Sequence, residues 1–138
     1  MEVAALITWL LTALGGFFML AIWLRGGGVR AAQTGSSAFP AGVLFGHFAL
    51  AAVGLIVWII FVLSDDGAGL AWTAFVILLP VAVLGFAMLL RWLAGRRAAV
   101  DAASAAPEQR FPLPVVVVHG LLAVTTVVLV VLAAVSVD

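Results

Sequence analysis

The fold is decided by residues 39–63, which read FPAGVLFGHFALAAVGLIVWIIFVL and contain no Asp, Glu, Lys or Arg. A helix rises about 1.5 Å per residue, so it needs roughly 20 apolar residues to cross about 30 Å of hydrocarbon. This stretch therefore predicts a membrane-spanning helix. Comparable apolar runs occur elsewhere, and we expect four spans, at 3–24, 39–63, 70–93 and 112–136.

The composition of the 138-residue chain points to the same class. Hydrophobic residues make up 67% of it and charged residues 9%, whereas a soluble domain carries about 25% charged residues. A net charge of zero without a basic run excludes a nucleic-acid partner. The absence of cysteine excludes disulfides, thiolate metal sites and covalent haem attachment. We expect an integral membrane protein surrounded by a lipid bilayer.

The arginines predict the orientation. They lie at or beside two of the connections, between the first two spans and between the last two: Arg25, Arg30, Arg91, Arg96, Arg97 and Arg110. By the positive-inside rule these connections face the cytoplasm and both termini lie outside it. Abundant Ala, Val, Gly and Arg without Lys is typical of a GC-rich bacterium. The expected location is a bacterial inner membrane, crossed several times.

The two halves of the chain resemble each other. A shift of 69 residues aligns 16–26 with 85–95 and gives seven identities in eleven positions. A shift of 72 residues aligns Phe-Pro-x6-His at Phe39 with the same pattern at Phe111. The halves therefore indicate a duplicated helical hairpin.

This duplication predicts the architecture. We expect an all-α, up-down four-helix bundle in the membrane, with the second and fourth helices parallel and diagonally opposed. It would form one transmembrane domain over 1–138, with repeat one at 1–66 and repeat two at 70–138.

The two histidines, His47 and His119, each fall eight residues after the Phe that opens their helix. This places both about 12 Å along the helix, at one depth on the cytoplasmic side. If both face the interior, a gap of roughly 14 Å separates the axes of their helices. Haem suits this gap because its iron takes two axial ligands on opposite faces, and without cysteine it would be non-covalent haem b. Alternatively, each imidazole simply bonds a loop carbonyl.

Small side chains and sulfurs surround the two positions. Residues three or four positions from each histidine lie on the same face of its helix. Together with the glycines and methionines at similar depth on the other two helices, they leave room for a flat ligand. The expected cofactor-binding residues are His47, His119, Ala51, Gly54, Ala123, Thr126, Gly16, Gly85, Met19 and Met88, with the two histidines as metal ligands. The arginines are candidate partners of haem propionates.

Two histidines on parallel helices resemble the membrane-embedded b-type cytochromes, such as the cytochrome b561 group, in which transmembrane helices each supply one His to a bis-His haem. A second His pair is missing from this sequence, so the resemblance implies one haem. It further implies an electron carrier or a small subunit of a larger oxidoreductase, without catalytic residues of its own. Partners would be another membrane protein or a second copy, and a quinone is a further candidate.

Two other functions fit the same residues. His47, His119, Met19 and Met88 together would suit Cu(I), which favours imidazole and thioether ligands. A cofactor-free accessory or scaffold subunit is the third possibility, and its histidine rings would turn toward the interface or into polar loop contacts.

Overall fold

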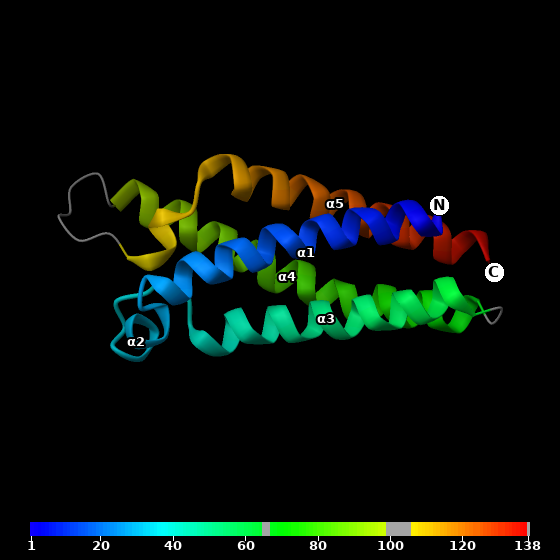
Figure 1. Cartoon of the computed structure of the whole chain (residues 1–138), viewed down its shortest axis with the longest axis horizontal. Coiled ribbons are helices and arrows are strands. Elements are labelled where there is room, and N and C mark those ends of the chain that lie inside the picture. The colour runs from blue at the N-terminus through cyan, green and yellow to red at the C-terminus, as the bar shows by residue number, and fades with distance from the viewer. Residues whose placement is uncertain (65–66, 99–105, 138) are drawn as a thin grey trace.

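Four long helices run side by side along the molecule (Figure 1). The computed structural model describes residues 1–64, 67–98 and 106–137, and over these ranges it has no strand. The long helices are α1 (Glu2–Arg25), α3 (Ala41–Leu63), α4 (Ala68–Ala98) and α5 (Leu113–Ser136). The N-terminus lies at the same end as the end of α5, and the short helix α2 (Gly28–Gln33) lies at the opposite end, the loop end (Figure 1). The expected all-α bundle is confirmed.

All four helices are long and apolar enough to cross a membrane. The shortest, α3, has 23 residues, and at about 1.5 Å per residue this length exceeds a hydrocarbon core of about 30 Å. Helices α1, α3 and α5 begin and end within two residues of the expected spans, whereas α4 continues to Ala98. The protein is a multi-pass membrane protein.

The repeated Phe-Pro pair marks the start of α3 and of α5. Pro40 and Pro112 are the N-cap residues, with φ of -60° and -63°. A proline fits there because its ring already holds the φ of an extended or helical residue and its missing N–H removes a donor that would lack a helical partner. The Pro40 carbonyl accepts hydrogen bonds from Val43 and Leu44. This shared start makes His47 and His119 each the seventh residue of its helix, at corresponding depths.

The helices pair across the two halves of the sequence. The most extensive contacts join α3 to α4 and α1 to α5, whereas α1 touches α3 much less. Helices α3 and α5 do not pack on each other and lie on a diagonal of the bundle. The two histidines therefore stand on diagonally opposed helices.

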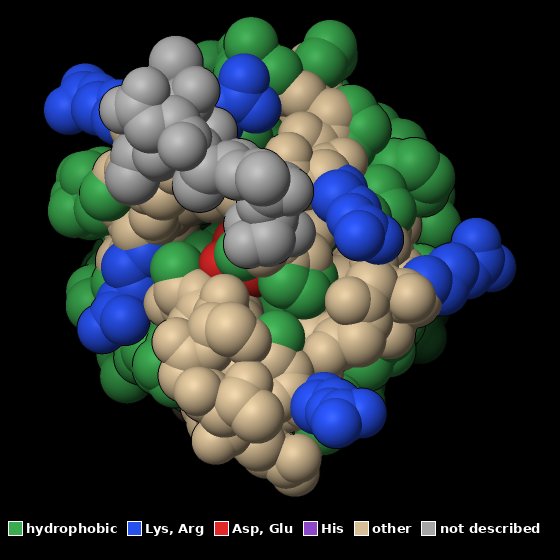
Figure 2. All heavy atoms as spheres, turned by 90° about the vertical axis from the view of Figure 1, so that its left-hand side faces the viewer, with side chains coloured by type: hydrophobic (Ala, Val, Ile, Leu, Met, Phe, Trp, Pro, Cys, Tyr) green, Lys and Arg blue, Asp and Glu red, His purple; other side chains and the backbone are tan. Residues whose placement is uncertain are grey.

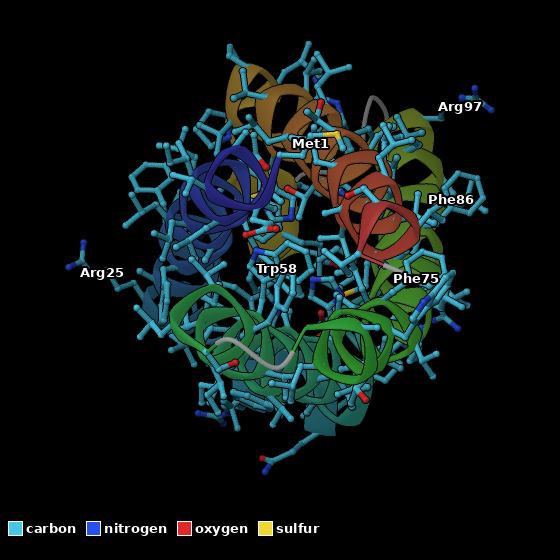
Figure 3. All side chains as sticks on the ribbon, turned by 90° about the vertical axis from the view of Figure 1, so that its right-hand side faces the viewer. Met1, Arg25, Trp58, Phe75, Phe86 and Arg97 are labelled. Carbon is cyan, nitrogen blue, oxygen red and sulfur yellow. The ribbon has the colours of Figure 1, made fainter. Side chains whose placement is uncertain are left out.

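The buried core is divided into two clusters. The terminal-end cluster consists of Ala5, Trp9, Trp58, Phe61, Ala71, Ala74, Leu78, Val81, Val130, Ala133 and Ala134. The loop-end cluster consists of Trp23, Phe39, Met88, Trp92 and Phe111. Figure 3 shows Trp58 pointing into the bundle and Phe86 pointing away from it.

A short 3-10 helix, η2 (Pro107–Arg110), packs against α1, α2 and α4 at the loop end. Its Glu108 is fully buried. The Glu108 carboxylate accepts hydrogen bonds from the Ser37 hydroxyl (2.9 Å) and the Ala38 N–H (2.7 Å), and its carbonyl accepts one from the Trp92 indole (3.0 Å). These bonds join the segment before α3 to the segment before α5. Neither α2 nor η2 was expected from the sequence.

Candidate cofactor site

Each histidine ring is held by a carbonyl group of the neighbouring helix. His47 Nδ1 lies 2.9 Å from the Val81 oxygen on α4, and His119 Nδ1 lies 2.9 Å from the Thr12 oxygen on α1. A carbonyl oxygen accepts and never donates, so Nδ1 carries the proton in both rings. In the neutral imidazole the other nitrogen, Nε2, then keeps its lone pair. Each ring therefore presents a nitrogen that can bind a metal ion.

The two rings have matching surroundings. Thr12 and Val81 are 69 residues apart, which is the offset of the sequence match between α1 and α4. Each ring also lies against a glycine. A Cβ at Gly16 would be 3.3 Å from Cε1 of His119, and a Cβ at Gly85 would be 3.1 Å from Cε1 of His47. The missing side chains thus let the rings approach the neighbouring helices closely.

The histidines stand on diagonal helices, and each ring packs against the helix next to its own. His47 contacts Gly85 on α4, and His119 contacts Gly15 and Gly16 on α1, whereas α3 and α5 do not pack together. The two imidazoles therefore lie in corresponding positions on two different helix–helix seams.

The packing is loose at this level, which we call the histidine band. It comprises 10–22, 40–53, 82–87 and 112–125, all described by the structure, and none of these residues is buried. On α1 this range covers roughly 20 Å of helix. A close-packed interior would bury a residue on nearly every turn, as the clusters on either side do. In this band the side chains are half-buried or exposed, so the tight packing of the two clusters does not continue through it.

Seven of the ten expected site residues lie in the histidine band. The two glycines touch the imidazoles, and Ala51 and Ala123 are half-buried one turn beyond each histidine. Met19 is also half-buried, but it packs against the loop-end cluster. The members of this group other than Met19 are His47, His119, Ala51, Ala123, Gly16 and Gly85.

The other expected residues belong to packed regions. Gly54 makes room for an indole, because a Cβ there would be 3.0 Å from Cζ2 of Trp9. The buried hydroxyl of Thr126 donates to the Leu122 carbonyl at 2.8 Å and lies 3.1 Å from the Thr8 hydroxyl. Met88 is buried in the loop-end cluster. Counting by helical periodicity could not resolve the depth at which tight packing begins.

The arginines gather around the edge of the loop end (Figure 2). Arg91 donates to the Ala38 carbonyl at 3.2 Å, and the Arg96 guanidinium lies 4.9 Å from the centre of the Trp92 ring. Arg25 and Arg97 point away from the bundle (Figure 3). In this arrangement the cations border the surface, where lipid phosphates would meet them.

Two features of this region were missed by sequence reasoning. The Thr12 and Val81 carbonyls carry no signal in the sequence because any residue supplies a carbonyl. Glu108 left no distinct signal either, because the same connection also contains Asp101 and three arginines.

The donor set fits haem and limits other metals. Within the described ranges there is no group of three or more His, Cys, Asp or Glu side chains that could hold a metal ion. A bis-His haem would need two protein ligands, and the two imidazoles provide that number. No protein-family model, curated protein or solved structure significantly matches this chain.

Proposed function

We propose that this protein is a membrane-embedded b-type cytochrome that holds one haem b between His47 and His119 and carries electrons. One observation carries the proposal: two imidazoles at corresponding depths on diagonal helices are each fixed through Nδ1–H, with Nε2 left as a ligand, in a band where no residue is buried. When bound, haem supplies a one-electron change between Fe(III) and Fe(II).

The residues of the chain position and tune the ligands. The carbonyls of Val81 and Thr12 accept the Nδ1 protons, which fixes ring orientation and makes Nε2 a stronger donor. Gly16 and Gly85 leave space beside the rings. With His47 and His119 both bound to a haem, the chain would leave no coordination position open for a substrate. An electron carrier fits this arrangement better than an enzyme.

The partner in this proposal is a membrane protein, as part of a larger oxidoreductase, or a second copy of the chain. A quinone is a further electron partner. The arginines at the loop end support an orientation with that end in the cytoplasm and both termini outside, in a bacterial inner membrane.

The test is an absorption spectrum of protein purified in detergent from cells supplied with haem. We expect one haem per chain and a sharp α-band in the reduced-minus-oxidised difference. His47→Ala and His119→Ala should each abolish six-coordinate low-spin iron. Thr12→Ala and Val81→Ala are matched controls that should keep it, because the backbone carbonyl of each residue remains.

Two results would contradict the proposal. The first is wild-type protein that stays free of haem after supplementation. The second is a low-spin spectrum that survives in either histidine variant while both proteins remain folded by circular dichroism.

A further inference from the structure

The loop end carries arginines around its edge (Figure 2), and all six arginines of the chain are exposed. Among the described residues the only acids are Glu2 and Glu108. Glu2 opens α1 at the other end of the bundle, and Glu108 is fully buried, with its carboxylate bonded to Ser37 and Ala38. The described residues at the loop end therefore present positive charge that none of their own acids neutralises.

Exposed apolar side chains accompany these cations. Four of the arginines lie within three positions of a large apolar residue that is between 40% and 52% exposed. A surface that sets guanidinium groups beside apolar side chains matches a phospholipid, which joins an anionic phosphate to acyl chains. A nucleic acid or an acidic protein in water would pair with the charges but would leave the apolar side chains uncovered. The four pairs are Arg25 with Leu24, Arg30 with Val29, Arg91 with Leu90, and Arg110 with Leu113.

Two guanidinium groups of α4 are held in place by the protein itself. Arg91 Nη1 donates to the Ala38 carbonyl at 3.2 Å, which ties the end of α4 to the segment before α3. The Arg96 guanidinium lies 4.9 Å from the centre of the Trp92 ring. A guanidinium has several N–H donors, so the bond to Ala38 leaves most of those of Arg91 for an oxyanion. A side chain held in advance loses less conformational freedom when it binds a ligand.

We propose that the loop end binds anionic phospholipids, with Arg91 as the held contact to a lipid phosphate and Leu90 beside an acyl chain. The side chain of Leu90 is 52% exposed and directly precedes Arg91, so one lipid reaches both. Arginine suits this role because its planar guanidinium pairs with a phosphate through two parallel hydrogen bonds. The inference is independent of the proposed haem, because it uses neither histidine.

The experiment is native mass spectrometry of the full chain in detergent with equal amounts of phosphatidylglycerol and phosphatidylcholine that have identical acyl chains. An arginine near an anionic headgroup contributes a factor of about five to binding, so we expect the wild type to retain phosphatidylglycerol in at least about fivefold excess. Arg91→Gln should lower this ratio about fivefold. Arg110→Gln should lower it less; it removes a charge without breaking a hydrogen bond to a described residue. Gln33→Ala is the matched control, an exposed neutral side chain at the same end, and should keep the wild-type ratio.

Three results would overturn the inference. The first is equal retention of the two lipids by the wild type. The second is a wild-type ratio in Arg91→Gln that circular dichroism shows to be folded. The third is displacement of phosphatidylglycerol by an equal concentration of glycerol 3-phosphate, which would indicate a site for free phosphate and not for a lipid. A wild type that prefers phosphatidylglycerol but holds no haem supports this inference and contradicts the cytochrome proposal, so the two fail separately.

Discussion

The glycines against the rings allow a sharp test of how the site is built. A Cβ at Gly85 would lie 3.1 Å from Cε1 of His47, and a Cβ at Gly16 would lie 3.3 Å from Cε1 of His119. Ordinary contacts of this kind begin at 3.4 Å. Gly85→Ala must therefore shift the His47 imidazole by about 0.3 Å, which disturbs its hydrogen bond to the Val81 carbonyl.

The expected cost follows from this overlap. Overpacking a well-defined contact costs about 1 to 3 kcal/mol, which corresponds to roughly 5- to 150-fold in an equilibrium constant. We expect Gly85→Ala to weaken haem binding within that range and Gly16→Ala to weaken it less, because its overlap is smaller. The assay is titration of haem into the detergent-solubilised apoprotein, followed by absorbance.

Matched controls sit beside each histidine. A Cβ at Gly46 or Gly120 meets no atom within 4 Å, so Gly46→Ala and Gly120→Ala should leave haem affinity unchanged. The reasoning would be refuted if Gly85→Ala bound haem as tightly as Gly46→Ala.

Three further predictions concern the parts that hold the bundle together. Glu108→Ala should lower the free energy of unfolding by about 3 kcal/mol, because it removes two hydrogen bonds to a buried carboxylate, each contributing about 1.5 kcal/mol. Thermal unfolding in detergent measures this loss. A melting temperature equal to that of the exposed-site variant Gln33→Ala would contradict the prediction. Trp92→Phe should lower the free energy of unfolding by about 1 kcal/mol, because the indole N–H no longer donates to the Glu108 carbonyl. A variant that melts at the wild-type temperature would contradict this. Leu78→Ala should cost about 2 to 5 kcal/mol by opening a cavity in the terminal-end cluster while leaving the haem spectrum unchanged; an altered spectrum would show that this cluster and the site are one unit.

The long helices could be predicted because the membrane sets their length. Residues 39–63 have to satisfy every backbone group internally to lie in hydrocarbon, and a helix does this within one segment. The short α2 and η2 escaped prediction because they lie outside the apolar runs and depend on contacts with other helices. Periodicity and length give no information about such tertiary contacts.

For the candidate site, the sequence indicated which residue types share a depth but not which partners they have. The Phe-Pro start and the eight-residue spacing predicted that His47 and His119 occupy matching positions. That each ring would bond a helix carbonyl, and which helix would supply it, depends on the pairing of α3 with α4 and α1 with α5. The placement of Gly54 and Thr126 in packed regions depends on the same pairing, because Trp9 and Thr8 reach them from α1.

The most direct test of the account is near-infrared magnetic circular dichroism of the oxidised, haem-loaded protein, which reports the identity of both axial ligands. The account predicts the charge-transfer band of low-spin iron with two imidazole ligands. A band typical of His and Met ligation, or a high-spin spectrum with one protein ligand, would contradict it.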